Sequence, residues 1–314
     1  MGRAVEKIKE GPDLSVDIAG IRLKNPVMTA SGTCGYGEEL SPYMDIGGTG
    51  AVVVKGLSLK PRDGNPPPRI VETPAGLINA IGLQNIGVEA FITEKLPVLK
   101  GYNVPVIVNI FGESAADYCE LAKRLEDTGD INALEINISC PNVKQGGIVY
   151  GKDPVEAYNL IKEIRRSTNL VIITKLSPNV TDIKEMARSV EEAGTDSISL
   201  INTITAMSVD IEKKRPRLAN IIGGLSGPAI RPVAVRMVWE ACQVVKAPVI
   251  GVGGIMRTED AIEFFIVGAS AVQVGAASLV NPTIIPEIVD GIKGYLVRHG
   301  VERFRDIVGT LETN

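Results

Sequence analysis

Several apolar, β-branched runs in this sequence end in polar residues that can do chemistry. In chain order these residues are Ser31, Lys55, Asn109, Asn137, Cys140, Lys175, Asn202 and Thr203. A lysine is costly to bury unless it is paired or has a function, so Lys55 and Lys175 indicate a functional site. Structural ion pairing, for example with Glu135, would account equally well for either lysine alone.

Cys140 lies in the segment NISCPNVKQGG, behind a β-branched run and ahead of Pro141, Gly146 and Gly147. A thiol at such a position can be inert packing, a nucleophile or a general base. The proline stiffens the chain beside the thiol, and the glycines would let the rest of the loop close over a ligand. This context favours a functional role for Cys140.

The other cysteines have different surroundings. Cys119 and Cys242 lie within helical patterns, where a cysteine is expected to pack as a small apolar residue. The role of Cys34, in SGTCGYG, stays open. The four cysteines are far apart and form no C-x-x-C pair, which argues against a disulfide framework and against an iron–sulfur or zinc site in this chain.

His299 is the only histidine, and it lies near the end of a predicted helix, where it would interact with the last carbonyl groups. A histidine-based catalytic triad is therefore excluded. A covalent nucleophile usually needs a base beside it, so we favour a general-base role for Cys140. A thiol with an ordinary pKa of about 8.5 can take a proton from a carbon next to a carbonyl group if a lid excludes water.

A double bond forms only if a hydride leaves the carbon next to the one that loses the proton. No amino-acid side chain accepts a hydride, whereas a flavin does. The asparagines near the thiol offer donors and acceptors that suit a neutral, imide-like ring. The residues thus predict a flavin-dependent oxidation of a small cyclic substrate.

The elements that must position these residues are eight apolar runs, each followed by a segment with helical periodicity. The runs span residues 26–32, 50–59, 104–112, 133–139, 170–178, 197–203, 247–254 and 271–277. Strands that alternate with helices pair in parallel, and eight units favour a closed (β/α)₈ TIM barrel over an open doubly wound sheet. Barrel enzymes keep their active sites at the mouth formed by the carboxyl ends of the strands.

Strand alternation agrees with a shared mouth, because Lys55, Asn109, Asn137 and Lys175 each share a face with the residue two positions earlier. Residues 14–26 predict a hairpin around Ala19 and Gly20 that would plug the bottom of the barrel. Long insertions follow the second and sixth strands, at residues 60–103 and 204–246, and such insertions are often lids or binding loops. We expect a single domain over residues 1–314.

Glycine-rich turns follow the last two strands, in GVGGI (251–255) and VGAAS (274–278). Small residues leave backbone N–H groups open to an anion, and the loops after strands seven and eight are the usual phosphate site of a barrel. Tight turns need glycine in any case, but two such turns at these strands favour a phosphorylated ligand. FMN is a flavin that satisfies this condition. GGLSGP, before the seventh strand, offers further N–H groups.

Composition limits the remaining choices. The chain has 314 residues, is 45% hydrophobic and carries a formal net charge of -4, so nothing suggests a basic nucleic-acid surface. No apolar run approaches the roughly 18 residues that would span a bilayer, and the first 20 residues lack the apolar core of a signal peptide. We expect a cytoplasmic protein.

The sequence contains, in chain order, the motifs TASGTCGYG, VVVKGLSL, NAIGLQN, VNIFG, EINISCPNVKQGG, TKLSPN, LINT, GVGGI and VGAA. Through these motifs it resembles class 1 dihydroorotate dehydrogenase over essentially the whole chain. That family is an FMN enzyme of pyrimidine (UMP) biosynthesis. The resemblance implies that Cys140 removes the C5 proton of (S)-dihydroorotate while the C6 hydride passes to N5 of FMN, giving orotate and reduced flavin. In the membrane-attached class 2 enzymes the base is a serine.

The resemblance also implies the binding residues. Substrate would be held by Lys55, Asn79, Gly82, Leu83, Asn137, Asn142, Asn202 and Thr203. FMN would be held by Ala30, Ser31, Lys55, Asn109, Asn137, Lys175, Gly227, Gly253, Gly254, Gly275 and Ala276. Lys175 matches the lysine near the flavin N1 edge, where a positive charge favours the anionic reduced flavin.

Within class 1, NAIGLQN and SCPNVKQGG resemble the NAD-linked class 1B catalytic subunit, whereas the fumarate-linked class 1A form tends towards NSMGLPN and SCPNVPGKP. Class 1B pairs this subunit with a second chain that carries FAD and a [2Fe-2S] cluster, as a homodimer within a heterotetramer. Two positions depart from the family pattern. Ala276 stands where threonine is common and Ala206 where glycine is common, which affects the phosphate contact and the loop after the sixth strand.

Two other functions compete with this interpretation. The fumarate-linked enzyme is the nearer alternative. A flavin-dependent tRNA dihydrouridine synthase is also a barrel with a catalytic cysteine, but a basic RNA-binding surface and an extra helical domain would be expected, and the sequence pI is near 5.4. A non-catalytic scaffold on a degenerate barrel would not need Lys55, Cys140, Lys175 and the glycine turns together.

Overall fold

The computed structural model describes residues 11–139 and 150–313. Its largest sheet has eight strands in the order β3-β16-β15-β10-β9-β8-β7-β4, all paired in parallel. The strands are β3 (Val27–Thr29), β4 (Val52–Leu57), β7 (Val106–Ile110), β8 (Ala133–Asn137), β9 (Val171–Lys175), β10 (Ser197–Leu200), β15 (Val249–Val252) and β16 (Ala271–Val274). Each of the eight predicted runs contains one of these strands, so the predicted strand set is confirmed.

Hydrogen bonds between β3 and β4 close the sheet into a barrel. Gly50 N–H donates to the Val27 carbonyl at 2.7 Å, and Thr29 N–H donates to the Ala51 carbonyl at 3.3 Å. Two residues further along, at Val53, the hydroxyl of Thr29 takes the place of a backbone group: it accepts from Val53 N–H at 2.8 Å and donates to the Val53 carbonyl at 3.3 Å. Closure excludes the open doubly wound sheet.

Alternation along each strand separates the inside of the barrel from its outer face. Val53, Ile107 and Ile173 belong to one apolar cluster inside the barrel. Their neighbours Val52 and Val106 belong to the larger cluster beneath the helices. Because side chains alternate with a period of two, the polar residue two positions after each inward residue faces the same interior.

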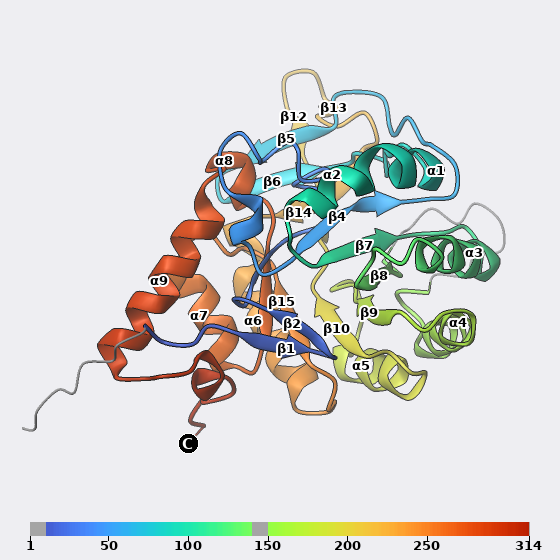
Figure 1. Ribbon diagram of the computed structural model, residues 1–314. Helices are drawn as coiled ribbons and strands as arrows, with labels where there is room; N and C mark the ends of the chain where they lie inside the picture. Colours follow the sequence, from blue (N-terminus) through green and yellow to red (C-terminus); the bar gives the residue numbers. More distant parts are fainter. Residues whose placement is uncertain (1–10, 140–149, 314) are drawn as a thin grey trace, which may run out of the picture.

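Helices surround the barrel, and their starts follow from short polar side chains (Figure 1). Ser114 caps α3 in a reciprocal capping box with Asp117, and Asp153 caps α4. The α-helices are α1 (Val88–Ala90), α2 (Leu96–Gly101), α3 (Ala115–Glu126), α4 (Pro154–Ser167), α5 (Ile183–Glu192), α6 (Arg231–Cys242), α7 (Thr258–Ile266), α8 (Ala277–Val280) and α9 (Ile284–His299). The π-helix η2 (Phe91–Lys95) joins α1 to α2, and the 3₁₀ helices are η1 (Ile46–Gly48), η3 (Pro228–Ile230) and η4 (Phe304–Ile307).

The predicted N-terminal hairpin is formed by β1 (Val16–Ile18) and β2 (Ile21–Leu23), which pair antiparallel. Its turn residues Ala19 and Gly20 have positive φ angles of 51° and 89°, as a two-residue turn of this kind requires. Ile18 and Leu23 are buried in the cluster that also contains the barrel residue Ala133. The hairpin therefore closes one end of the barrel, as predicted.

The two insertions pair with each other, which the sequence did not reveal. The insertion after β4 supplies β5 (Ile70–Thr73) and β6 (Gly76–Asn79), and the insertion after β10 supplies β11 (Ile204–Met207) and β14 (Ile222–Ser226). They form an antiparallel sheet in the order β11-β14-β6-β5. Figure 1 shows β5 and β6 at the end of the barrel opposite to the β1–β2 hairpin.

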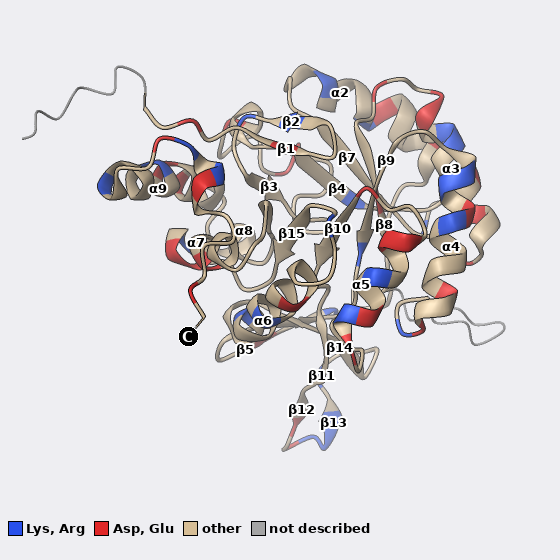
Figure 2. Cartoon of the chain, turned by 90° about the horizontal axis from the view of Figure 1, so that it is seen from below, with Lys and Arg blue, Asp and Glu red and all other residues tan. Residues whose placement is uncertain are grey.

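A small hairpin of β12 (Val209–Asp210) and β13 (Arg215–Pro216) projects from the second insertion. In Figure 2 it extends away from the body of the molecule, with basic residues on and beside β13. In the part of the chain that the structure describes, no helix has the length and apolar character needed to cross a membrane.

Replacing Thr29 by valine tests the role of its hydroxyl in closing the barrel. We expect Thr29→Val to lower the free energy of unfolding by about 1–3 kcal/mol, because the buried N–H of Val53 loses its acceptor. Urea denaturation measures this change. Thr29→Ser is the matched control, since it keeps the hydroxyl; equal stability of the valine and serine variants would contradict the assignment.

Candidate active site

Glu135 on β8 is the centre of a polar network inside the barrel. Its side chain is 0% exposed, and four side chains from four other strands donate to it. Asn109 Nδ2 lies 2.6 Å and Lys175 Nζ 3.5 Å from Oε2, while Gln273 Nε2 lies 2.6 Å and Ser199 Oγ 2.9 Å from Oε1. This arrangement satisfies a buried carboxylate that would otherwise be very costly to desolvate.

The network keeps Glu135 ionised. Burial acts to raise the pKa of this carboxyl group, but the Lys175 ammonium and the donors from Gln273, Asn109 and Ser199 outweigh it, so the net pKa is lowered from its ordinary value. The carboxylate form can accept all four hydrogen bonds, whereas a protonated acid would have to donate one.

Lys175 connects this network to the end of β3. Its side chain is nearly buried, and Nζ donates to Ser31 Oγ at 3.0 Å as well as to Glu135. The ion pair with Glu135 that the sequence suggested is thus present. Lys175 also ends β9, so the ion pair does not remove it from the mouth of the barrel. Lys175, Ser31 and Asn109, three of the expected cofactor residues, are brought together here.

A second polar group lies beside the first, around Asn137 at the end of β8. Asn202 Nδ2 lies 3.4 Å from Asn137 Oδ1, and Ser139 N–H donates to the same oxygen at 3.2 Å. Tyr118 of α3 donates its hydroxyl to the Asn137 carbonyl at 2.9 Å, which fixes the strand end from outside the barrel. Asn202 Oδ1 in turn accepts from Thr203 N–H at 2.8 Å.

Lys55 differs from Lys175 because no carboxylate of the described residues forms an ion pair with it, although Glu39 is near enough to act on its charge. The register between β4 and β7 shifts between Val54 and Leu57, so Lys55 lies in an irregular, bulged part of the strand. Burial lowers the pKa of its half-buried ammonium group. Within residues 11–139 and 150–313, its side chain makes no hydrogen bond or ion pair, which leaves it available to an anionic group.

The first insertion brings three expected substrate residues to the same end of the barrel. Asn79 ends β6 and donates to the Gly224 carbonyl of β14 at 3.3 Å. Gly82 and Leu83 have positive φ angles of 78° and 59°. A Cβ on Gly82 would lie 2.4 Å from the backbone nitrogen of Asn65, so this tight turn requires glycine.

The glycine turns after β15 and β16 have free backbone donors. The N–H groups of Gly253, Gly254, Gly275 and Ala276 donate to no other group among the residues that the structure describes. All four residues are partly exposed. Open N–H groups on two neighbouring turns are suited to binding an anion such as a phosphate group.

Packing also requires glycine at Gly254 and leaves little room for a side chain at Gly275. A Cβ on Gly254 would lie 2.8 Å from the Gly227 carbonyl oxygen and 2.9 Å from Arg231 N, and a Cβ on Gly275 would lie 3.3 Å from Ala30 Cβ. Gly254 also has φ of 70°. GGLSGP is only partly a loop, because residues 222–226 form β14 and pair with strands on both sides.

Cys140 and Asn142 lie outside the described residues. Among the other cysteines, burial raises the pKa of Cys34 to about 11 and that of Cys242 to about 12, so both remain protonated and unreactive at neutral pH. Cys34 packs in the core, with Sγ 3.2 Å from the Val53 carbonyl oxygen.

Two members of the network, Ser199 and Gln273, were missed by the sequence analysis. A signal was present, because Gln273 is a lone amide in the apolar run AVQVG, and the same reasoning drew attention to the two lysines. Ser199 stands two residues after Ser197, and a small hydroxyl in an apolar strand is a weaker signal.

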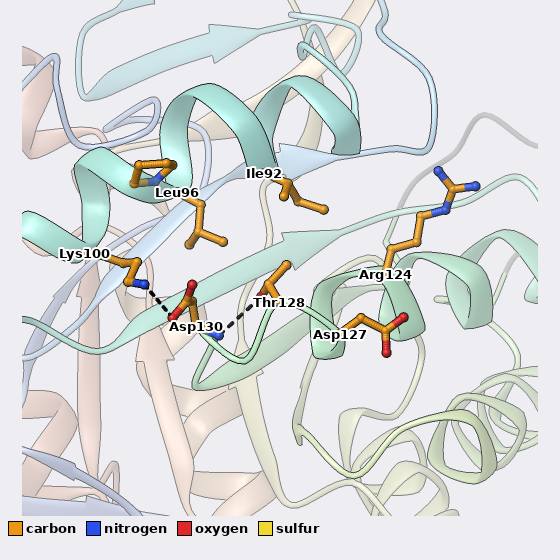
Figure 3. A pocket seen from close by; sticks show the side chains of 8 residues that line it. Ile92, Leu96, Lys100, Arg124, Asp127, Thr128 and Asp130 are labelled. Carbon is orange, nitrogen blue, oxygen red and sulfur yellow. Dashed lines mark hydrogen bonds and ion pairs between the residues drawn. The ribbon is translucent and has the colours of Figure 1, made fainter.

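A surface groove of about 440 Å³ lies elsewhere, between η2–α2 and the end of α3 (Figure 3). Lys100 of this groove forms an ion pair with Asp130 at 2.8 Å. None of its lining residues belongs to the networks above, so it is separate from the polar interior of the barrel.

Replacing Glu135 by glutamine should flatten the acid end of the stability profile. A carboxyl group with a lowered folded pKa stabilises the fold above its unfolded pKa, ordinarily 4.5, and this stabilisation is lost as the pH falls through the lower folded value. We therefore expect the free energy of unfolding to fall more steeply for wild type than for Glu135→Gln as the pH is lowered from 6 to below 4.5. Urea denaturation across this range measures it; parallel profiles would contradict the lowered pKa.

Comparison with known proteins agrees with this geometry. The chain matches the family described as Dihydroorotate dehydrogenase over residues 13–296. It is 56% identical over 302 residues to the "Dihydroorotate dehydrogenase B (NAD(+)), catalytic subunit" of Geotalea uraniireducens, covering 96% of this chain and 99% of that protein. Proteins of the same name from Trichlorobacter lovleyi and Geobacter sulfurreducens are 57% and 55% identical over 301 residues, with the same coverage. The chain therefore belongs to the dihydroorotate dehydrogenase family.

Proposed function

We propose that this chain is the catalytic subunit of an NAD-linked dihydroorotate dehydrogenase, which oxidises dihydroorotate to orotate in pyrimidine biosynthesis. The observation that carries the proposal is the likeness to relatives of that name along 96% of the chain. The polar residues at the strand ends are chemically suited to the substrate, a carboxylate on an imide-like ring.

FMN is the cofactor that we propose for the barrel mouth. When bound, FMN supplies the hydride acceptor that no side chain provides. Two features of the described residues fit it. Asn109 Oδ1 is a buried acceptor without a donor, suited to a ring N–H group, and the free N–H groups of Gly253, Gly254, Gly275 and Ala276 suit its phosphate.

The remaining cofactor contacts are proposed from the family resemblance. Ala30 and Ser31 follow β3, Gly227 follows β14, and Asn137 and Lys175 end their strands. Lys175 would bring a positive charge to the flavin ring, because its ammonium group is held between Ser31 and Glu135.

The chain's own residues would divide the substrate chemistry. Cys140 is proposed as the base that accepts the C5 proton. The unpaired ammonium of Lys55 suits the substrate carboxylate, and Asn79, Asn137 and Asn202 offer amide groups to the ring. Asn142, Thr203, Gly82 and Leu83 complete the proposed substrate set.

We further propose that a partner subunit carries FAD and a [2Fe-2S] cluster and passes the electrons to NAD. The relatives are named as catalytic subunits of NAD-dependent enzymes, which favours this acceptor over fumarate. The four cysteines of this chain lie far apart in the sequence and form no C-x-x-C pair, which argues against a cluster in this chain. A homodimer of barrels within a heterotetramer completes the proposal.

The direct test is an anaerobic titration of the FMN-reconstituted chain with dihydroorotate. We expect the absorbance of oxidised flavin to bleach in proportion to the substrate added, since the first half-reaction needs no electron acceptor. Protein that binds FMN but does not bleach would contradict dihydroorotate as the substrate. Protein that takes up no FMN would contradict the cofactor.

Cys140→Ala should keep FMN bound and slow flavin reduction by dihydroorotate about 10²–10⁴-fold, because only the proton acceptor is removed. Anaerobic stopped-flow absorbance measures the rate, and the flavin spectrum measures FMN content. Cys119→Ala is the matched control, since this cysteine lies on α3 and should react at the wild-type rate. Unaltered kinetics in Cys140→Ala would remove it from the mechanism.

A further inference from the structure

Glu135, Ser199 and Gln273 come from β8, β10 and β16, the fourth, sixth and eighth strands of the barrel in chain order. In a TIM barrel, alternate strands contribute the side chains of one interior layer. The registers fit such a layer. Glu135 pairs with Ile173, and Ile173 with Ser197, yet the side chain that reaches Glu135 is two residues further along, at Ser199.

The same two-residue step relates the other members of the layer. Ser199 pairs with Ile250 and Ile250 with Ala271, so the step leads to Gln273, which donates to Glu135. The second barrel strand contributes the apolar Val53, which pairs with Ile107, and Ile107 pairs with Ala133, two residues before Glu135. Branched apolar residues dominate such layers, so a carboxylate bound by two members of its own layer is unusual.

The other two donors to Glu135, Asn109 and Lys175, come from the intervening strands β7 and β9 and belong to the proposed cofactor site. Each is held in a particular orientation by the carboxylate. Asn109 directs Nδ2 to Glu135 at 2.6 Å, which leaves Oδ1 on the other side of the amide and without a donor. Lys175 directs Nζ to Glu135 and Ser31.

Charge is the second consequence of this arrangement. Glu135 and Lys175 are both more than nine-tenths buried and form an ion pair at 3.5 Å. Charges separated from water act on their surroundings more strongly than exposed charges do. The carboxylate therefore offsets much of the field that the Lys175 ammonium would otherwise exert on a bound ligand.

We infer that Glu135 is a positioning residue for the cofactor: it orients Asn109 and Lys175, and its negative charge lowers the reduction potential of the bound flavin. This inference rests on the proposed FMN function. A flavin gains negative charge on reduction, so a fixed carboxylate nearby disfavours the reduced form, while Lys175 favours it. The balance of the pair, and not Lys175 alone, would set the potential.

The test is the FMN midpoint potential of the reconstituted protein, measured by equilibration with a reference dye. Glu135→Gln preserves shape, and the amide of Gln273 has an oxygen without a donor that can accept from the new amide group if Gln273 rotates, so Asn109 can keep its orientation. We expect its flavin to be easier to reduce by on the order of tenfold in the equilibrium constant, about 30 mV for a two-electron couple.

Ser199→Ala is the matched control, because it removes one hydrogen bond to the same carboxylate and keeps the charge; its potential should stay near the wild-type value. An unchanged potential in Glu135→Gln with full FMN content would overturn the inference. That result differs from failure of the proposed function, in which wild type itself would bind no FMN.

If Glu135→Gln does not fold, the double variant Glu135→Gln/Lys175→Met decides the question. It removes both charges of the buried pair, which proteins often tolerate. A midpoint potential close to that of wild type would support the inference that the charges of Glu135 and Lys175 offset each other at the flavin. A potential well below wild type would mean that only the lysine acted on the flavin, and would overturn the role of Glu135.

Discussion

The carboxylate of Glu135 has no access to water, so its oxygens have to find their donors within the protein. Asn109, Lys175, Ser199 and Gln273 supply them, each from a different strand. Because the hydrogen bonds have fixed lengths and directions, this one side chain sets the relative positions of five strands just inside the polar mouth. The polar side chains nearer the mouth are positioned by this network, because Lys175 also donates to Ser31 and Asn109 is held by Glu135.

Closure of the barrel and the pairing of the two insertions complete the surroundings of the site. The hydroxyl of Thr29 bridges the first and second strands, while β6 and β14 join segments that are separated by 145 residues at Asn79 and Gly224. The insertion sheet thus brings Asn79, at the end of β6, and Gly227, directly after β14, to the end of the barrel that carries the strand-end residues. Lids or binding loops were expected of the insertions, and the structure shows that parts of both pair in an ordered antiparallel sheet.

In the glycine turns, the lack of a side chain meets two requirements: close backbone packing and open backbone N–H groups. Gly254 is required by its positive φ angle and by the close approach of Gly227 and Arg231. The same absence of a side chain leaves the turn's N–H groups open. Packing alone would account for the glycines, and the free donors on two adjacent turns are the additional feature that supports a phosphate site.

The sequence by itself determined the strand set, the barrel class, the hairpin and the family, because a period of two in eight apolar runs and ordered motifs are local properties. It also indicated Lys175 and Glu135, since charges inside apolar strands are conspicuous. Tertiary structure alone decided which donors meet Glu135, why Thr29 closes the barrel and how the insertions pair. Those contacts depend on the stagger between strands far apart in the chain, which brings Ser199 rather than Ser197 to the carboxylate. No local pattern encodes that stagger, because it arises only when the sheet closes on itself.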